Sequence, residues 1–109
     1  MSNRRRYTLD DIHSDACYQI PKFLFQGEFK GLNSDAKVLY SLLCNHHELN
    51  TINEWVNENG DIYLIFSRES MCDMLRRTDK TVTKIMNNLQ KHKLIEVSWQ
   101  GDTAAVRLI

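Results

Sequence analysis

Apolar residues near the end of the chain recur with the period of a helix. At about 100° per residue, four of them share one face over residues 78–91: Val82, Ile85, Met86 and Leu89. Lys, Thr and Asn fill the opposite face and its flanks. Thr78 is a suitable N-cap, so the pattern predicts an amphipathic helix that begins directly after it.

A shorter helix is predicted just before this one. Ser67 can cap its N-terminus, and three apolar side chains are expected to face inward: Met71, Met74 and Leu75. Arg76 and Arg77 end this helix, and Thr78 already begins the next. Two short helices with so tight a connection are typical of a helix-turn-helix.

Segments with strand character flank the two helices. Residues 94–99 alternate between apolar and polar, residues 100–103 suit a turn, and residues 104–109 return as a second strand. Before the helices, an Asn-Gly step at residues 59–60 predicts a hairpin turn, which is followed by a strong strand over residues 61–66. The sequence therefore predicts one hairpin on each side of the helix pair.

The first part of the chain is expected to add a largely buried helix. Asn33 or Ser34 can cap it, and its apolar residues cover much of its circumference: Ala36, Val38, Leu39, Tyr40, Leu42 and Leu43. A short helix should begin at Pro21. The larger aromatic residues are expected to lie mostly in the core, namely Phe23, Phe25, Trp55, Tyr63 and Phe66.

This order of elements predicts an α+β fold, mainly α: a winged helix-turn-helix with a β-hairpin wing and an additional hairpin before the helix-turn-helix. A chain of 109 residues is long enough for one domain with its own core. We expect residues 18–109 to form this winged-helix domain and residues 1–17 to be a flexible, basic N-terminal arm. Arg4, Arg5 and Arg6 in the arm suit a minor-groove contact, and they suit a solvated terminus equally well.

The charge distribution favours a polyanionic partner, although the formal net charge is zero. Six basic residues lie from Arg76 to Lys93, against Asp79 as the single acidic residue. Such a local excess produces a positive face that attracts nucleic acid. The Thr and Asn residues between the lysines are mediocre helix formers, but they can bond to phosphate oxygens or base edges. The helix over residues 78–91 is therefore predicted to contact DNA.

The expected DNA-binding residues lie on this helix and on the turn at residues 100–103. Basic side chains would contact phosphates. An Asn amide can bond bidentately to adenine, and a Thr methyl group can contact the thymine methyl. Four residues are expected to face base edges: Thr81, Thr83, Lys84 and Asn87. The complete set is Arg77, Thr78, Lys80, Thr81, Thr83, Lys84, Asn87, Lys91, Gln100 and Thr103.

Four segments also resemble a known family: YQIPKFLF, GLNSDAKVLYSLL, WVNENGDIYLIF and DKTVTKIMNNLQKHKLIEV. They are similar to the N-terminal domain of RepA-type replication initiators of low-copy plasmids in Gram-positive bacteria. The resemblance covers nearly all of residues 18–109. It implies a winged-helix domain that binds, as a homodimer, to repeated sequences in a plasmid origin, where it initiates plasmid replication. It also implies a C-terminal domain, absent from this chain, that recruits host replication proteins.

Two positions depart from the pattern of that family. Lys93 follows the predicted helix where such sequences commonly have Gly, so it must either adopt a left-handed conformation or end the helix differently. The predicted wing turn contains Asp102 and no Lys or Arg. Its electrostatic attraction to DNA is therefore expected to be weak, although Gln100, Thr103 and backbone N–H groups remain able to reach phosphates.

Other chemistries lack their sequence motifs. The odd set of Cys17, Cys44 and Cys72 contains no CxxC pair, and the His residues near them do not complete the ligand spacing of a zinc site. Glycine-rich phosphate loops and local motifs of nucleophilic catalysis are also missing, as is an apolar run long enough to span a membrane. We expect a cytoplasmic protein with reduced thiols that is not an enzyme and needs no cofactor or metal.

Two other functions stay open on the sequence alone. A transcriptional repressor of the same fold would use the same helix, but it would bind one palindrome at a promoter rather than repeats at an origin. A winged helix can also serve protein–protein contacts, with its basic face against an acidic partner. That third function predicts no affinity for DNA at physiological salt.

Overall fold

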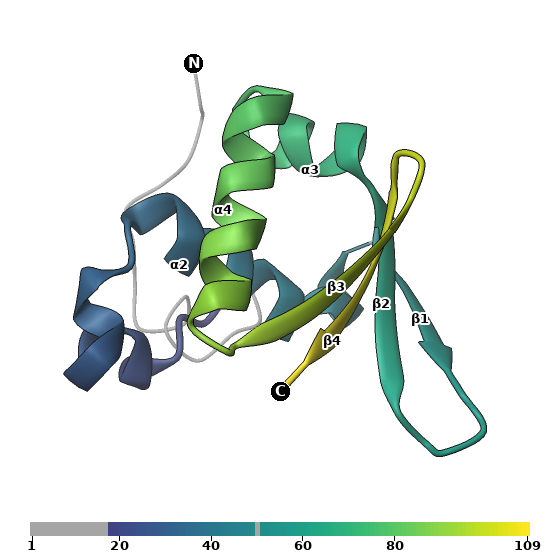
Figure 1. Ribbon diagram of the computed structural model, residues 1–109, viewed down its shortest axis with the longest axis horizontal. Coiled ribbons are helices and arrows are strands. Elements are labelled where there is room, and N and C mark those ends of the chain that lie inside the picture. The colour runs from purple at the N-terminus through teal and green to yellow at the C-terminus, as the bar shows by residue number, and fades with distance from the viewer. Residues whose placement is uncertain (1–17, 50) are drawn as a thin grey trace, which may run out of the picture.

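The computed structural model describes residues 18–49 and 51–109. The expected arm, with Arg4, Arg5 and Arg6, lies outside the described residues. The elements follow in the order η1 (Lys22–Phe25), η2 (Gly27–Gly31), α2 (Ser34–Cys44), η3 (His46–Glu48), β1 (Asn53–Val56), β2 (Ile62–Ser67), α3 (Arg68–Leu75), α4 (Asp79–Lys91), β3 (Ile95–Gln100) and β4 (Thr103–Leu108), where η marks a 3₁₀ helix (Figure 1).

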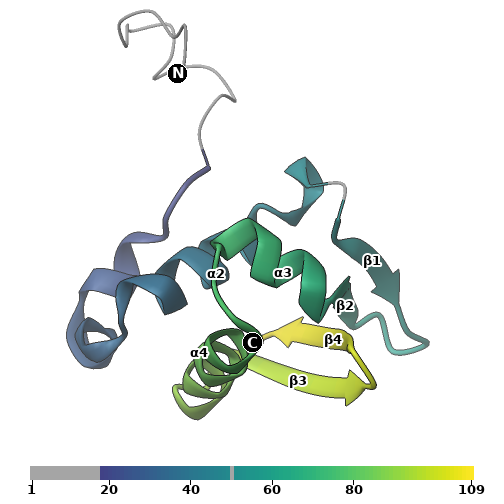
Figure 2. The same cartoon turned by 90° about the horizontal axis from the view of Figure 1, so that it is seen from above.

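The four strands form one antiparallel sheet in the order β1-β2-β4-β3. Leu64 on β2 and Val106 on β4 pair with each other and are both buried, as every second residue of a half-covered strand should be. The α-helices pack on this buried face (Figure 2). The predicted winged helix-turn-helix, with an additional hairpin before it, is confirmed: α3 and α4 are the helix pair, β3–β4 is the wing and β1–β2 is the earlier hairpin.

The N-caps that begin the three α-helices are those the sequence predicts. The Asn33 Oδ1 atom accepts a hydrogen bond from the Ala36 N–H at 2.8 Å, which caps α2. The Ser67 hydroxyl accepts from the Ser70 N–H at 3.0 Å and caps α3. Each cap satisfies one of the backbone donors that a helix leaves without a partner at its N-terminus. Helix α4 begins in the same way at Thr78.

The core joins the inner face of the sheet to α2, α3 and α4. On α4 the four apolar residues that share a face are all buried, as expected. On α3 only Met71 is fully buried, while Met74 and Leu75 are half-buried at its edge. The largest fully buried side chains are Leu24, Leu39, Leu43, Leu64, Met71, Val82, Met86, Leu89, Ile95 and Val106.

Four of the residues expected to lie mostly in the core are exposed instead. Trp55 is 53% exposed, because β1 is an edge strand whose four residues are all exposed; its ring lies 5.6 Å from that of Tyr63. Phe23 and Phe25 flank the buried Leu24 on a 3₁₀ turn too short to bury all three. Val38 is 42% exposed, because α2 has one side turned away from the core.

Helix α4 ends in a left-handed residue, the first of the two alternatives expected for Lys93. Lys93 has φ of 61°, its N–H donates to the Gln90 carbonyl at 3.0 Å, and the Leu94 N–H donates to the Leu89 carbonyl at 3.1 Å. Leu89 and Leu94 are both buried. These are the two hydrogen bonds and the apolar contact of a Schellman motif, in which Gly is the usual residue at the left-handed position.

Replacing Lys93 with Gly should stabilise the domain. The left-handed conformation costs a side chain about 1 kcal/mol that Gly does not lose, so Lys93→Gly should raise the free energy of unfolding by about that amount. Urea unfolding followed by circular dichroism measures it. Lys91→Gly is the matched control, because Lys91 is the last residue of the helix proper and Gly there should lower stability. If both variants lower stability equally, the left-handed strain assigned to Lys93 is absent.

Candidate nucleic-acid interface

The outward face of α4 is a row of long polar side chains. Lys80, Lys84, Asn87 and Lys91 are all exposed and follow one another at spacings of four, three and four residues. At a rise of about 1.5 Å per residue the row extends over about 16 Å. In the part of the chain that the structure describes, no carboxylate pairs with these three lysines. The row therefore presents three unneutralised ammonium groups and one amide.

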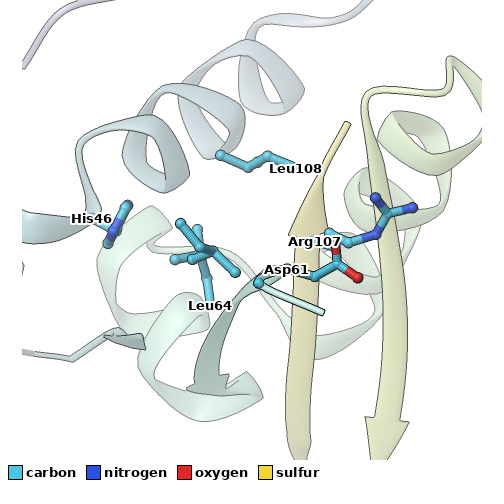
Figure 3. Close-up of a pocket in the computed structure, with 7 residues that line it drawn as sticks. His46, Asp61, Leu64, Arg107 and Leu108 are labelled. Atoms are coloured by element: carbon cyan, nitrogen blue, oxygen red, sulfur yellow. The ribbon is translucent and has the colours of Figure 1, made fainter. Parts of the chain in front are cut away.

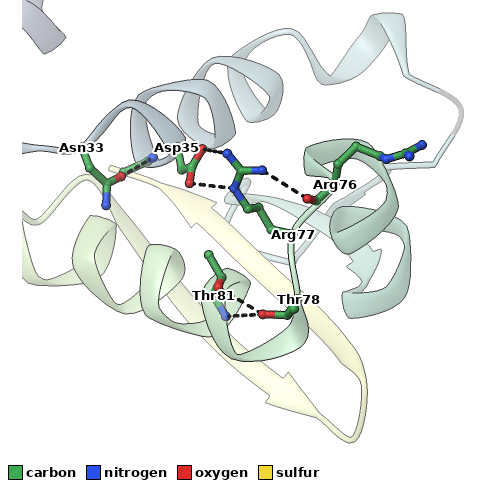
Figure 4. A network of polar contacts seen from close by, with 7 residues as sticks. Asn33, Asp35, Arg76, Arg77, Thr78 and Thr81 are labelled. Carbon is green, nitrogen blue, oxygen red and sulfur yellow. Dashed lines mark hydrogen bonds and ion pairs between the residues drawn. The ribbon is translucent and has the colours of Figure 1, made fainter.

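The threonines beside this row are partly committed to the helix itself. Thr78 is the N-cap of α4: its Oγ1 accepts from the Thr81 N–H at 3.4 Å and lies 3.1 Å from the Thr81 Oγ1 (Figure 4). The Thr83 hydroxyl donates to the Asp79 carbonyl at 3.0 Å. Since the Thr83 hydroxyl already donates its proton, it can only accept a further hydrogen bond from a ligand. The Thr83 methyl group remains available for an apolar contact. Thr81 and Thr83 are half-buried at the edges of the row.

Arg77 is already paired, which its position in the sequence does not reveal. Its Nε and Nη2 atoms donate to the two carboxylate oxygens of Asp35 on α2, at 3.0 and 3.3 Å (Figure 4). Its Nη1 atom donates to the Arg76 carbonyl at 3.2 Å. Bidentate arginine–carboxylate pairs are geometrically specific. Arg77 therefore ties the turn between α3 and α4 to the start of α2, and its charge is largely balanced.

Arg76 is a further candidate for DNA contact that is not among the residues predicted from the sequence. It is exposed, and it has φ of 56° and ψ of 45° at the end of α3. Its side chain extends away from Arg77 in Figure 4. The signal was its place in the basic segment, but the sequence alone does not decide which of two adjacent arginines is paired.

The wing is a tight hairpin without positive charge at its tip. Gln100 pairs with Thr103, and Gly101 between them has φ of 61°, as the first residue of a type II′ turn requires. Gln100 and Thr103 are exposed, and the Asp102 carbonyl accepts from the Arg68 N–H at 2.7 Å. The wing tip and the start of α4 lie at the same end of the molecule in Figure 1. The expected residues on the wing and on the first turn of α4 therefore share one end.

The hollow in Figure 3 has a volume of about 330 Å³ and offers no reactive group free of other contacts. The His46 Nε2 atom, on its rim, lies 3.0 Å from the Glu54 Oε2. The Arg107 guanidinium bonds to Glu96 on the neighbouring strand. The rest of the lining is largely apolar, so the hollow contains neither a nucleophile–base pair nor a phosphate cradle.

The described cysteines are poor nucleophiles. Burial raises the pKa of the Cys44 thiol, and burial followed by the nearby Asp79 raises that of Cys72. Burial, with Cys44 beside it, raises the pKa of Tyr40 to about 12. A thiol with a raised pKa stays protonated at neutral pH, whereas the thiolate is the reactive form.

Residues 18–49 and 51–109 contain neither a metal site nor a membrane-spanning helix. No three His, Cys, Asp or Glu side chains there lie close enough together to hold a metal ion. In the same residues no helix has the length and apolar character needed to cross a bilayer.

A protein-family model and a curated protein each match most of the length of the chain. The model of the family described as the N-terminus of replication initiator protein A matches residues 16–109. A curated relative, a 41 kDa protein of Lactobacillus helveticus, is 26% identical over 98 residues, which are 89% of this chain and 28% of the relative. The chain therefore spans little more than a quarter of that relative's length.

Solved structures resemble nearly all of the chain. One, described as an N-terminal domain of a DNA-binding protein, has a TM-score of 0.72 and 28% identity and covers 98% of this chain and 84% of its own. A second, described as a Rep–DNA complex, has a TM-score of 0.72, 29% identity and coverages of 96% and 83%. A third, described as an MDR initiator, has a TM-score of 0.72, 26% identity and coverages of 96% and 85%.

The cap of α4 gives a direct test of this local structure. Thr78→Ala removes the hydroxyl that the Thr81 N–H and hydroxyl both contact, so it should lower the free energy of unfolding by about 1 kcal/mol. Thr78→Ser keeps the hydroxyl and should stay close to the wild type. Chemical unfolding of the three proteins measures the difference. A Ser variant as unstable as the Ala variant would mean that the methyl group, and not the hydroxyl, provides the stability.

Proposed function

This chain belongs to the family of replication initiator protein A N-termini, and from that premise we propose that it binds duplex DNA at repeated sequences in a plasmid origin and thereby initiates plasmid replication. The observation that carries the proposal is the exposed row on α4. It combines Asn87 with three lysines that pair with no carboxylate of the described residues, on a helix anchored by its opposite face. One similar solved structure is a Rep–DNA complex, which supports DNA as the ligand.

The chemistry of the row suits the major groove. That groove is about 12 Å wide and admits one α-helix, and its base edges present donors and acceptors that differ between base pairs. Asn87 is central to the row and is the residue we assign to adenine. Lys84 and the edges of Thr81 and Thr83 would contact neighbouring bases, while Lys80 and Lys91 at the ends of the row would contact phosphates.

The remaining expected residues have supporting roles. Thr78 holds the start of α4, where backbone N–H groups favour a phosphate. Arg77 would reach the backbone with a guanidinium that stays paired to Asp35, and the neighbouring Arg76 is the better phosphate contact. Gln100 and Thr103 on the wing would bond to the adjacent backbone without adding charge. We propose Arg4, Arg5 and Arg6 as a minor-groove arm preceding a binding domain of residues 18–109.

Catalysis is not part of this proposal. The described thiols are held protonated, and the outward face of α4 suits reversible binding rather than bond making. We propose that the protein acts in the cytoplasm, where plasmid DNA lies, and that host replication proteins bind to a separate C-terminal domain of the full protein.

Self-association is proposed through the β1–β2 hairpin. β1 is an edge of the sheet, so among residues 18–49 and 51–109 no strand lies beside its outer backbone groups. Trp55, Val56 and Ile62 are about half exposed on this hairpin, which projects toward the end of the molecule opposite the wing (Figure 1). A second copy that pairs here would bury these residues and leave both α4 helices free for DNA, in keeping with the homodimer implied by the family.

Mutations of the row should separate base contacts from phosphate contacts. A cognate site is first selected from random duplex DNA at about 0.15 M salt, where exposed charges more than about 8 Å apart are screened. By fluorescence anisotropy, Asn87→Ala should weaken binding to that site by about 1–3 kcal/mol and leave random DNA unaffected. Lys80→Gln should weaken both and reduce the slope of log K against log salt by about one unit.

The control is Gln26→Ala, which removes an exposed amide between η1 and η2 and should change neither affinity. If Asn87→Ala leaves specificity intact, Asn87 does not contact a base. Selection that enriches no sequence would leave only backbone binding, and complete absence of binding would favour a protein partner instead. A single enriched palindrome in place of repeats would favour the transcriptional repressor.

The dimer has its own test by light scattering. Val56→Lys places a charge on the proposed interface, so the wild type at micromolar concentration should have twice the monomer mass and the variant the monomer mass. Val38→Lys changes a similarly exposed valine on α2 and should stay dimeric. A monomeric wild type, or equal effects of both variants, would refute the hairpin as the dimer surface.

A further inference from the structure

Arg68 joins three parts of the proposed DNA-binding surface that are far apart in the sequence. It is the first residue of α3. Its side chain reaches Asp79, the first residue of α4, and Trp99 on β3. Its backbone N–H donates to the carbonyl of Asp102 in the wing turn, at 2.7 Å. A single residue therefore contacts the start of the proposed recognition helix, strand β3 and the turn between β3 and β4.

The contacts use the planar shape of the guanidinium as well as its charge. The Nε atom lies 3.1 Å from the Asp79 Oδ1, and the Cζ atom lies 4.2 Å from the centroid of the Trp99 ring. The side chain is only 24% exposed. Its Nε–H is buried and makes no well-aligned hydrogen bond, so the contact with Asp79 is one between charges. A lysine could keep that charge, but it could not stack on the indole in the same way.

Asp79 makes this arrangement consequential for DNA binding. Its carboxylate is 64% exposed in the first turn of α4. A negative charge there interacts favourably with the helix dipole. The same charge would repel a phosphate that approaches the helix N-terminus. The neighbouring Arg68 offsets this charge from the side of the protein, where a hollow of about 260 Å³ separates α3, α4 and the wing.

We propose that Arg68 is a positioning residue for DNA recognition, which fixes the wing relative to α4 and neutralises Asp79 without contacting DNA itself. The proposal rests on the proposed function and deepens it, because it names a determinant of specificity outside the exposed row. A helix and a wing can contact adjacent parts of one site only if their relative position is held, and a site whose supporting residues hold it too loosely fails.

Four variants separate the geometric role from the charge. Arg68→Met removes the charge and the planar stack, Arg68→Lys keeps the charge alone, and Asp79→Asn removes the carboxylate. The double variant Arg68→Met/Asp79→Asn restores the charge balance without restoring the stack. Affinities for the selected site and for random duplex are measured by anisotropy. Thermal unfolding identifies any variant that does not fold, and Arg68→Lys then carries the test.

Arg68→Met should weaken binding to the selected site and lower its preference over random DNA by about tenfold, which is the effect of one mismatched base pair. Asp79→Asn should bind both DNAs more tightly. The double variant should bind random DNA about as tightly as the wild type does, but its preference for the selected site over random DNA should stay reduced. Arg68→Lys should bind random DNA like the wild type and show the same reduced preference.

A readout that needs no DNA tests the contact directly. In a Trp55→Phe background the tryptophan fluorescence, excited beyond the absorption band of tyrosine, comes from Trp99 alone. The Arg68 guanidinium covers this ring, so Arg68→Met should make its fluorescence more sensitive to quenching by acrylamide. Quenching that is unchanged in a folded Arg68→Met protein would refute the stacked position of Arg68.

The other outcomes are equally decisive. If the double variant recovers full preference, Arg68 acts by charge alone and the positioning role is wrong. If Arg68→Met weakens both DNAs equally and lowers the salt slope by about one, Arg68 is a phosphate contact. A wild type that binds no duplex at all overturns the proposed function and, with it, a role for Arg68 in DNA recognition. If the wild type binds selectively and Arg68→Met binds with the same selectivity, only the role of Arg68 is overturned.

Discussion

The burial of one face of α4 is the constraint on which the proposed interface depends. Val82, Ile85, Met86 and Leu89 are each at most 2% exposed, and the helix packs against α2, α3 and β3. Turning the helix by one residue would rotate it by about 100° and bring polar side chains into the core. Its rotational position is therefore fixed by packing, and the lysine-rich face must point outward whether or not DNA is present.

Ion pairs within the domain decide which charges are left for a ligand. The chain as a whole is neutral, and two arginines near α4 are held by carboxylates: Arg77 by Asp35 and Arg68 by Asp79. These pairs balance charges at the start of α3 and in the turn that leads into α4. Arg76 and the lysines of α4 are left as positive groups that face solvent. A neutral protein can in this way present a local positive surface that steers a polyanion toward one helix.

Most of the fold could be predicted from the sequence because its determinants are local. Three kinds of signal each depend on only a few neighbouring residues: the helical period of apolar residues, the caps at Asn33 and Ser67, and the glycines of the two hairpin turns. All have the predicted role. What could not be predicted depends on which distant side chains meet. The partner of Arg77 is 42 residues away, and the exposure of Trp55 follows from the place of β1 at the sheet edge. The candidate row on α4 was predictable for the same local reason, whereas Arg68, which joins three elements, was not.

The most direct test of whether the outward face of α4 contacts DNA is to map the surface that duplex DNA covers. Backbone amide resonances of the isotopically labelled protein can be followed while the selected duplex is added. If α4 is the recognition helix, the large shifts should fall on the outward residues of α4 and on the β3–β4 turn, and DNA should leave the β1–β2 hairpin unaffected. Shifts confined to the outer face of the sheet or to the η1 and η2 segments would contradict this prediction, because α4 would then not be the element that contacts DNA.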